Sequence, residues 1–580
     1  LGAENAGGPY TLIVSGKNTI TLSNVLVGDV WLCSGQSNME WTVANSDNAA
    51  DEIRQADFPM IRHLKVQNAV AGEPQQDIKG GSWMVCSPET VADFTAVGYF
   101  FARDLTRDLG VPIGLINSSW GGTHVETWTS REAFEGSDAF REMIAGLPRL
   151  DLDAMAREKN AAVLKKIEAM QGPLNQSAAD IQSWREHSFD ASSWKQMEVP
   201  GLWEQQGLPN VDGVIWYRKQ IDLPAEKAGQ AATLVLGTID DNDETYVNGV
   251  KVGATNRYNE RRSYAVPAAL LKAGRNIIAV RVEDTGGGGG FYGEADALAL
   301  TIGSSAIPLA GPWSFRIESM NMASSVGPNS YPTLLYNAMI HPLVPYGIKG
   351  AIWYQGESNA GRAYQYRTAF PLMITDWRKR WGQGDFPFYF VQLASFGADH
   401  GDSRKGSTWA ELREAQARTL SLPHTGMVVT TDIGDPVDIH PRNKQDVGKR
   451  LAAVALREAF QKDIMAGGPV FQSMKVEGNR VRLSFTQTGG GLLVRDKYGY
   501  IKGFEVAGKD QQFHYAKAFL EGDQVIVFHD KVAEPVAVRF GWADDASDNN
   551  LFNKEGFPAL PFRTDRWKET TREAKFTIGN

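Results

Sequence analysis

Cysteine is nearly absent from this sequence, with two residues, Cys33 and Cys86, in 580 positions. Small secreted folds that depend on disulfides use many more cysteines, and a cysteine-based zinc site needs them in closely spaced pairs. Both classes are therefore excluded. One bridge between Cys33 and Cys86 stays open at this stage, and the cysteine content does not identify the compartment in which the protein works.

Long apolar runs and clusters of basic residues are also missing. No uninterrupted apolar stretch approaches the roughly 18 residues that indicate a membrane-spanning helix, and the start of the chain, LGAENAGGPY, lacks the regions of a signal peptide. The chain carries 68 acidic and 59 basic side chains, with no basic run that could follow a phosphate backbone. The composition argues against a membrane span and against nucleic acid as a partner.

What the sequence does have is enough length for several domains and a regular alternation of strand and helix patterns. A single hydrophobic core stops growing at about 250–300 residues, so this chain is expected to form two to four domains. The expected strands cover residues 25–34, 111–122, 348–356, 386–396 and 425–434, and the expected helices cover 92–110, 333–343, 363–381, 411–420 and 443–460. The alternation predicts an α/β fold with a parallel sheet and helices on both faces.

Three further stretches have the short strands and the Gly, Asn and Asp turns of β domains. They cover residues 1–24, 184–307 and 467–580. The middle stretch interrupts the α/β pattern and predicts an inserted β-sandwich of the jelly-roll kind. The first stretch is too short to bury a core of its own. The predicted division is therefore 1–24, 25–183, 184–307, 308–466 and 467–580.

Polar residues suited to chemistry follow the ends of the predicted parallel strands, where open α/β sheets bind their ligands. Ser37 follows the first strand, and the stretches 121–122, 355–359 and 432–440 follow three others. A serine at this edge can act as an acyl-transfer nucleophile when an imidazole accepts its proton, and His440 is the best placed of the nine histidines.

Each of these residues also has a purely structural interpretation. A Ser-Asn pair after a strand is most often a helix cap, a glycine pair often marks only a tight turn, and Gln355 can be a polar turn residue. His440, followed by Pro441 in the expected first turn of a helix, can simply bond to backbone. The catalytic interpretation rests on the expectation that all four segments lie together at one edge of the sheet.

Four motifs in this order resemble those of the SGNH-hydrolase superfamily, and specifically the sialate O-acetylesterase family of carbohydrate esterases. They read GQSNM, SSWGGTHVETW, WYQGESNAG and DIHPRNKQDVGKRLA, and the resemblance covers nearly the whole chain. It implies a flavodoxin-like, three-layer hydrolase domain in two parts, 25–183 and 308–466. It also implies a serine esterase that removes acetyl groups from sialic acid and needs no metal or organic cofactor.

The resemblance implies a role for each matching residue. Ser37 matches the nucleophile, and its backbone N–H matches the first donor to the oxyanion. The second donor matches Gly121, which we favour over Gly122. Gln355 stands where many superfamily members have an asparagine that supplies the third donor, and its longer side chain can serve the same purpose. His440 matches the general base.

The acid of the triad departs from the pattern of the superfamily. Many members have Asp-x-x-His, but the residue three positions before His440 is Val437. We favour Asp438, two positions before the histidine, as the carboxylate that orients the ring. Asp435 and Glu357 are the alternatives, and Glu357 can instead cap the helix that follows it.

The predicted insert, 184–307, resembles the N-terminal sugar-binding-like β-sandwich of family 2 glycoside hydrolases. The resemblance lies in SSWKQMEVPGLWEQQG, GVIWYRKQIDLP and DDNDETYVNGVKVG. That domain is often structural, so we expect its aromatic residues to pack in a core rather than to bind sugar. The aromatic candidates are Trp203, Trp216 and Tyr246. Asp240, Asp241 and Asp243 are interpreted as turn carboxylates rather than as a metal loop.

Family members usually have a further β-rich segment before AGGPYTL, the point near which this chain begins. We therefore expect residues 1–24 to be the remnant of an N-terminal β domain and to pack with 467–580. The resemblance also implies a secreted or periplasmic protein. The oligomeric state is left open by the sequence.

Three functions remain in competition. The first is removal of acetyl groups from sialic acid, and the second is removal of acetyl groups from a plant polysaccharide such as xylan, mannan or pectin. The third is carbohydrate binding without catalysis, against which the presence of Ser37, Gln355 and His440 argues. The sequence does not identify the glycan, because specificity lies in loop geometry.

Overall fold

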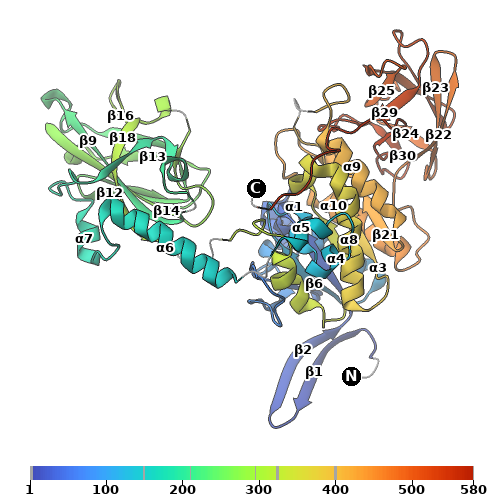
Figure 1. Cartoon of the computed structure of the whole chain (residues 1–580), viewed down its shortest axis with the longest axis horizontal. Helices are drawn as coiled ribbons and strands as arrows, with labels where there is room; N and C mark the ends of the chain where they lie inside the picture. Colours follow the sequence, from blue (N-terminus) through green and yellow to red (C-terminus); the bar gives the residue numbers. More distant parts are fainter. Residues whose placement is uncertain are drawn as a thin grey trace. The chain divides into compact units, whose positions relative to one another are not determined.

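The computed structural model describes residues 4–147, 151–209, 211–293, 295–321, 326–397 and 401–578. The chain divides into two compact units (Figure 1). The first combines Leu1–Leu150 with Gly327–Asn580, and the second is Asp151–Val326.

A seven-stranded sheet lies at the centre of the first unit. Its strands are β3 (Asp29–Gly35), β4 (Phe58–Lys65), β5 (Trp83–Cys86), β6 (Ile113–Ser119), β19 (Gly350–Tyr354), β20 (Phe388–Val391) and β21 (Thr425–Val428). They are arranged in the order β21-β20-β19-β3-β6-β4-β5. Neighbouring strands run parallel except β5, which is antiparallel to β4. The strand β4 was not expected, because Arg62, His63 and Lys65 interrupt its apolar pattern.

Helices cover both faces of this sheet, because alternate side chains of each central strand point to opposite faces. Trp31 and Cys33 of β3 pack in one core with α3 (Ala96–Leu109) and α10 (Lys444–Glu458). Leu32, between them, packs in the other core with α8 (Ala363–Trp381) and α9 (Thr408–Arg418). Burial on both sides explains why these strands are continuous apolar runs in the sequence.

Several expected elements are shorter or of another kind. The expected helix at 333–343 is a π-helix, Tyr336–Ile340, followed by the 3-10 helix His341–Leu343. The strands β20 and β21 end several residues before the expected ends at 396 and 434. As a result the stretch from 434 to 443 is free to form a loop at the carboxyl edge of the sheet.

The first strands of the chain, β1 (Gly7–Ser15) and β2 (Thr19–Val27), form a hairpin (Figure 1). In the part of the chain that the structure describes, these strands pair only with each other. Their large apolar side chains stay accessible, with Ile13 60% and Val14 51% exposed. The expectation that residues 1–24 pack with 467–580 is therefore wrong, because the apolar side chains of the hairpin are not covered by that segment.

The second unit consists mainly of two antiparallel sheets. Its strands are β7 (Lys195–Val199), β8 (Gly201–Leu202), β9 (Gly213–Leu223), β10 (Ala232–Asp240), β11 (Asn242–Val247), β12 (Val250–Thr255), β13 (Arg261–Val266), β14 (Gly274–Asp284), β15 (Gly290–Tyr292), β16 (Ala299–Ile302), β17 (Ser305–Pro308) and β18 (Gly311–Met320). One sheet has the order β12-β11-β14-β9-β18-β7, and the other has the order β17-β16-β10-β15-β8 with β13 also paired to β10. Side chains from both sheets share one core. The helix α6 (Leu152–Gln171), which was not expected, precedes the sheets.

The aromatic candidates of the second unit are buried. Trp203 is fully buried and donates its indole N–H to the Val211 carbonyl at 2.7 Å. Trp216 and Tyr246 are 3% and 5% exposed and stack on each other with 5.8 Å between ring centroids. These rings pack in the interior, as expected, and do not present a face to a sugar.

The acidic turn of the second unit also serves the fold. Asp243 forms a fully buried ion pair with Arg262 at 2.9 Å, and Asp241 accepts hydrogen bonds from Thr285. Across the described residues of both units, no group of three or more His, Cys, Asp and Glu side chains is arranged to hold a metal ion.

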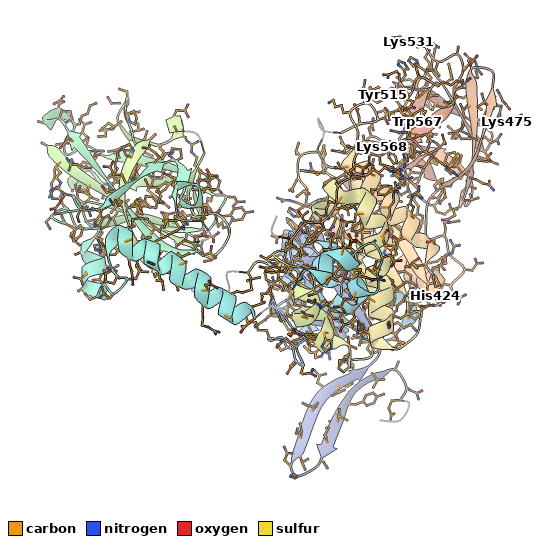
Figure 2. All side chains as sticks on the ribbon, in the orientation of Figure 1. His424, Lys475, Tyr515, Lys531, Trp567 and Lys568 are labelled. Carbon is orange, nitrogen blue, oxygen red and sulfur yellow. The ribbon has the colours of Figure 1, made fainter. Side chains whose placement is uncertain are left out.

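The C-terminal segment of the first unit is rich in short antiparallel strands, from β22 (Val470–Glu477) to β31 (Phe562–Arg563). Its core includes Val481, Phe504 and Phe540. Tyr515, labelled in Figure 2, is 63% exposed, with the Arg404 guanidinium 4.8 Å from the centre of its ring. This segment therefore has an exposed aromatic ring, whereas Trp203, Trp216 and Tyr246 of the second unit are buried.

The two cysteines, Cys33 and Cys86, are buried and form no bridge with each other. Cys33 lies in β3 and Cys86 ends β5, so the two side chains come from strands that do not neighbour each other in the sheet. None of the helices within the described ranges is long and apolar enough to cross a membrane.

Candidate active site

Ser37 is the first residue of α1 (Ser37–Glu40), immediately beyond the central strand β3. The chain can turn there because Gly35 has a φ of +134°, and a Cβ at that position would lie 2.2 Å from the carbonyl oxygen of Tyr354 in β19. Only glycine allows this approach. Backbone N–H groups at the start of a helix lack acceptors within the helix, and among the described residues none accepts from the Ser37 N–H.

His440 contacts Ser37 although the two residues lie 403 positions apart in the sequence. Its Nε2 lies 2.8 Å from Ser37 Oγ, which suits transfer of the hydroxyl proton to the imidazole. The helix α10 begins at Lys444 with Asn443 as its cap, so Pro441 precedes the helix and does not occupy its first turn as expected. The reason is that the Asn443 side chain accepts from the backbone N–H of Asp446 and fixes a later start.

The environment of the His440 ring favours its neutral form. The indole of Trp41 stacks on the ring, with 5.1 Å between centroids and 14° between planes. Burial lowers the pKa of His440, the Asp438 carboxylate raises it, and the Lys444 ammonium lowers it. The net result is a pKa below the ordinary histidine value, which leaves the imidazole ready to accept a proton.

Three carboxylates were considered as the partner of this ring, and the structure places them differently. Asp438 Oδ1 lies 3.6 Å from His440 Nδ1, beyond hydrogen-bond length, and accepts the backbone N–H of His440 at 2.8 Å. Asp435 accepts the backbone N–H groups of Val437 and Asp438 and so holds the turn. Glu357 bonds to the side chain of Asn38 at 2.6 Å.

Gly121 lies beside the nucleophile, since a Cβ on it would be 3.3 Å from the Ser37 Cβ. Its N–H, the expected second donor to the oxyanion, donates to Glu40 Oε2 at 2.7 Å. Glu40 Oε1 accepts in turn from Lys65 Nζ at 3.0 Å. Lys65 also donates to the Ser119 carbonyl at the end of β6. The expected donor is therefore present at the site, and a carboxylate is its acceptor in this structure.

Gln355, the expected third donor, is fully buried, and both its side-chain nitrogen and its side-chain oxygen form hydrogen bonds. Its Nε2 donates to the Thr123 carbonyl at 3.0 Å and to Asn359 Oδ1 at 2.6 Å, and its Oε1 accepts from the Tyr366 hydroxyl at 2.9 Å. Both amide hydrogens are thus engaged, and an oxyanion could bind here only in exchange for one of these bonds.

The remaining polar residues of the motifs join the four segments to one another. Gln36 donates its backbone N–H to the Tyr354 carbonyl, and its side-chain oxygen accepts from the backbone of Gly356. Asn359 accepts the backbone N–H of Val125 at 2.9 Å. The segments around 37, 121, 355 and 440 therefore meet at the carboxyl edge of the sheet.

Several residues of this site were not predicted from the sequence, namely Asn38, Glu40, Trp41, Lys65 and Lys444. Lys444 Nζ donates to Asn38 Oδ1 at 2.6 Å, and both side chains are buried. A sequence signal for Lys444 did exist, because a lysine at the first position of a helix opposes the helix dipole.

A family model for carbohydrate esterases, described as sialic acid-specific acetylesterase, matches residues 27–188 and 322–457. These ranges contain all four motifs and more than half of the chain. The chain belongs to this family. The family expected from the four motifs is thereby confirmed.

Curated relatives of this acetylesterase family member include mammalian sialate O-acetylesterases. The protein of Mus musculus is 25% identical over 516 residues, which cover 83% of this chain and 66% of the relative. The protein of Homo sapiens is 23% identical, over 83% of this chain and 64% of the relative. The chain thus spans about two thirds of the length of the curated relatives it matches.

A solved structure is more similar in sequence than these relatives. The crystal structure of a carbohydrate acetylesterase from Xanthomonas citri is 31% identical, with a TM-score of 0.63. The match covers 98% of this chain and 88% of that one, so the likeness extends over both compact units.

Proposed function

We propose that this protein is a serine esterase that removes O-acetyl groups from carbohydrates through an acetyl-serine intermediate. The observation that carries the proposal is the 2.8 Å contact between His440 Nε2 and Ser37 Oγ. A hydroxyl beside a neutral imidazole is the arrangement that nucleophilic acyl transfer requires. Membership of a family described by acetylesterase activity supports the same conclusion.

In the first step, Ser37 Oγ attacks the acetyl carbonyl carbon while His440 Nε2 takes the hydroxyl proton. The carbonyl oxygen becomes an oxyanion, which the backbone N–H groups of Ser37 and Gly121 stabilise. The intermediate collapses, the bond between the acetyl carbon and the sugar oxygen breaks, and the imidazolium returns the proton to that oxygen. The products are a free sugar hydroxyl and acetylated Ser37.

In the second step, water repeats the attack on the acetyl group. His440 Nε2 takes a proton from the water, whose oxygen bonds to the acetyl carbon and forms a second oxyanion at the same donors. Collapse of this intermediate breaks the bond to Ser37 Oγ, which receives the proton from His440. Acetic acid leaves as acetate at neutral pH, and the enzyme returns to its starting state.

Asp438 assists by interacting with the imidazolium that forms in both steps. Its Oδ1 is 3.6 Å from His440 Nδ1 in the free enzyme, and such contacts often shorten when substrate binds. Gly121 donates to the oxyanion after Glu40 has moved from its N–H. In this proposal Gln355 holds the segments around 123 and 359 through the two hydrogen bonds that it donates, and it does not supply the third donor.

Sialic acid is the leading substrate, because the curated relatives are named sialate O-acetylesterases. An acetylated plant polysaccharide such as xylan, mannan or pectin is the alternative. It is supported by the higher identity to the Xanthomonas citri enzyme, which is described as a carbohydrate acetylesterase.

The fold and location follow the same resemblance. The parallel sheet with helices on both faces supports an SGNH-hydrolase domain made of residues 25–183 and 308–466, with 184–307 as an inserted β-sandwich and 467–580 as a C-terminal domain. A secreted or periplasmic location is part of this proposal and follows from the family alone.

Release of acetate from acetylated sialoglycans and acetylated xylan, measured side by side, tests the proposal. We expect release from at least one of them by the wild-type protein, and none above background by Ser37→Ala. A higher kcat/KM for the sialoglycan supports the leading substrate, and a higher value for xylan supports the alternative. Binding of both glycans without release of acetate would make the chain a carbohydrate-binding protein.

A further inference from the structure

Lys444 occupies a position that is unfavourable for a lysine. Its side chain is fully buried, which is rare for this residue type. It is also the first residue of α10, where the positive end of the helix dipole opposes a cation. Burial lowers the pKa of Lys444 to about 7, with Glu357, Asp438 and Asp47 acting in the opposite direction. The buried ammonium of Lys444 therefore needs hydrogen-bond acceptors, and those it has belong to residues beside Ser37 and His440.

The ammonium of Lys444 is held by oxygen atoms and aromatic faces. It donates to Asn38 Oδ1 and to the Pro441 carbonyl, both at 2.6 Å. It lies 5.7 Å from the centre of the Trp41 ring and 5.5 Å from that of Tyr354, which are distances typical of cation–π contacts. Trp41 is the residue that stacks on His440.

Asn38, which accepts from Lys444, bonds to the residue before His440 in the chain. Its Nδ2 donates to the Ile439 carbonyl at 3.0 Å and to Glu357 Oε1 at 2.6 Å, so both amide hydrogens are used. The amide orientation is fixed by its partners, because an ammonium has no acceptor and a carboxylate has no donor. The other oxygen of Glu357, Oε2, is buried and has no hydrogen-bond partner among the described residues.

These contacts hold the backbone on both sides of the general base. The carbonyl before His440, that of Ile439, accepts from Asn38, and the carbonyl after it, that of Pro441, accepts from Lys444. Asn38 is the neighbour of Ser37 on the chain. The same side chains therefore tie the histidine loop to the helix that carries the nucleophile, while the contact of His440 with Asp438 is long at 3.6 Å.

We propose that Lys444, Asn38 and Glu357 form a positioning unit that holds His440 against Ser37 through the two carbonyls flanking the histidine. The inference rests on the proposed esterase function. None of the three residues needs to touch the substrate. Their effect is on the Ser37–His440 distance and on the charge near the imidazole, because a misplacement of about 1 Å can lower turnover by about 100-fold.

Lys444→Met is the principal test, because methionine fills a similar volume without charge. We expect kcat for a chromogenic acetyl ester to fall by about 10- to 100-fold and KM to change by less than about twofold. The rate at which a fluorophosphonate labels Ser37 should fall by a similar factor. Lys449→Met, on an exposed position of the same helix, is the matched control and should leave both rates unchanged.

The pH profile separates positioning from a general structural role. The groups facing His440 are Asp438, which raises its pKa, and Lys444, which lowers it. Loss of the Lys444 cation should therefore raise the pKa of His440 and move the acidic limb of kcat/KM to higher pH. A role confined to stability would lower the melting temperature without moving this limb.

Lys444→Met leaves Glu357 without its nearby cation, so a Lys444→Met/Glu357→Gln double variant removes both charges and keeps an acceptor for Asn38. Buried ion pairs replaced by uncharged groups often leave stability unchanged or improved, so this variant is expected to fold. The same loss of kcat and of labelling rate is expected.

Unchanged kcat and labelling in a folded Lys444→Met or double variant would overturn the positioning unit and leave the esterase proposal standing. A rise in KM at unchanged kcat would also overturn it, by making Lys444 a substrate-binding residue. By contrast, absence of Ser37 labelling in the wild-type protein would overturn the esterase proposal itself.

Discussion

The backbone N–H of Gly121 donates a 2.7 Å hydrogen bond to Glu40 Oε2, three residues beyond the nucleophile on α1. This is the N–H that the esterase mechanism needs for the oxyanion. In the proposed mechanism, the Glu40 carboxylate thus occupies the place where negative charge develops during the reaction. An ester carbonyl has to displace that carboxylate before the donor can act, so Glu40 is a competitor of the substrate at this atom.

Weakening this competitor should make the enzyme faster. In Glu40→Gln the acceptor becomes neutral, and hydrogen bonds to neutral groups are weaker than those to charged groups by about 1 kcal/mol. We expect kcat/KM to rise by about three- to tenfold. Steady-state kinetics on a small acetyl ester measure this. A fall of more than about tenfold would show instead that Glu40 and Lys65 hold the segment around Gly121 in its working position.

The carboxylate that serves His440 is tested by two matched substitutions. Asp438→Asn should lower kcat by orders of magnitude, up to about 10⁴-fold if the carboxylate acts as in a full triad. Asp435→Asn should be nearly silent, because Asp435 bonds only to the backbone of the turn. The reverse result would move the acid to Asp435.

If both variants stay within about threefold of wild type, less than about 1 kcal/mol of barrier, neither carboxylate is the acid. The site would then work as a Ser37–His440 pair supported by Asn38 and Lys444, with Glu357 as the nearest remaining carboxylate in the network.

The pH dependence of kcat/KM should follow the ionisation of His440. Burial is the largest influence on its pKa and lowers it, so the base should remain neutral to a lower pH than an exposed histidine. Asp438 raises this pKa, and Asp438→Asn should therefore move the acidic limb to lower pH, opposite to the shift expected for Lys444→Met. A common direction for both variants would contradict the assigned electrostatics.

Gln355→Ala tests whether this residue is structural. It removes the donor to the Thr123 carbonyl and the side-chain acceptor of the Tyr366 hydroxyl, at about 1–3 kcal/mol for each, whereas Asn359 Oδ1 keeps its bond from the Val125 N–H. We expect a lower melting temperature, whereas Gln512→Ala, at an exposed position, should be neutral. Unchanged stability with a 10²- to 10³-fold loss of kcat, the magnitude for a lost oxyanion donor, would restore Gln355 as the third donor.

The positions of Ser37 and His440 could be predicted from sequence because the topology of a parallel sheet brings the ends of its strands to one edge. The alternating pattern predicted five of the seven strands, β3, β6, β19, β20 and β21, and the resemblance of the insert to a largely structural domain led us to expect the packing of Trp203, Trp216 and Tyr246 in a core. These conclusions depend on apolar patterns and short motifs, which are local properties of the chain.

Other features depend on side-chain contacts that no local pattern specifies. The bond between Glu40 and Gly121 joins residues from different segments, and the two hydrogen bonds of Gln355 are set by acceptors at 123 and 359. The isolated pairing of β1 with β2 depends on which surfaces remain uncovered after folding, and the late start of α10 depends on the cap at Asn443.

The most direct test of the central claim is to look for the acetyl group on Ser37 during turnover. The wild-type protein is mixed with an acetylated substrate, quenched with acid in the first turnovers, and digested for mass spectrometry. We expect the acetyl group on the peptide that contains Ser37, and neither acetylated peptide nor acetate release above background in Ser37→Ala, since loss of a triad nucleophile lowers kcat by about 10⁶-fold. Acetate release by Ser37→Ala at near wild-type rate would contradict the account.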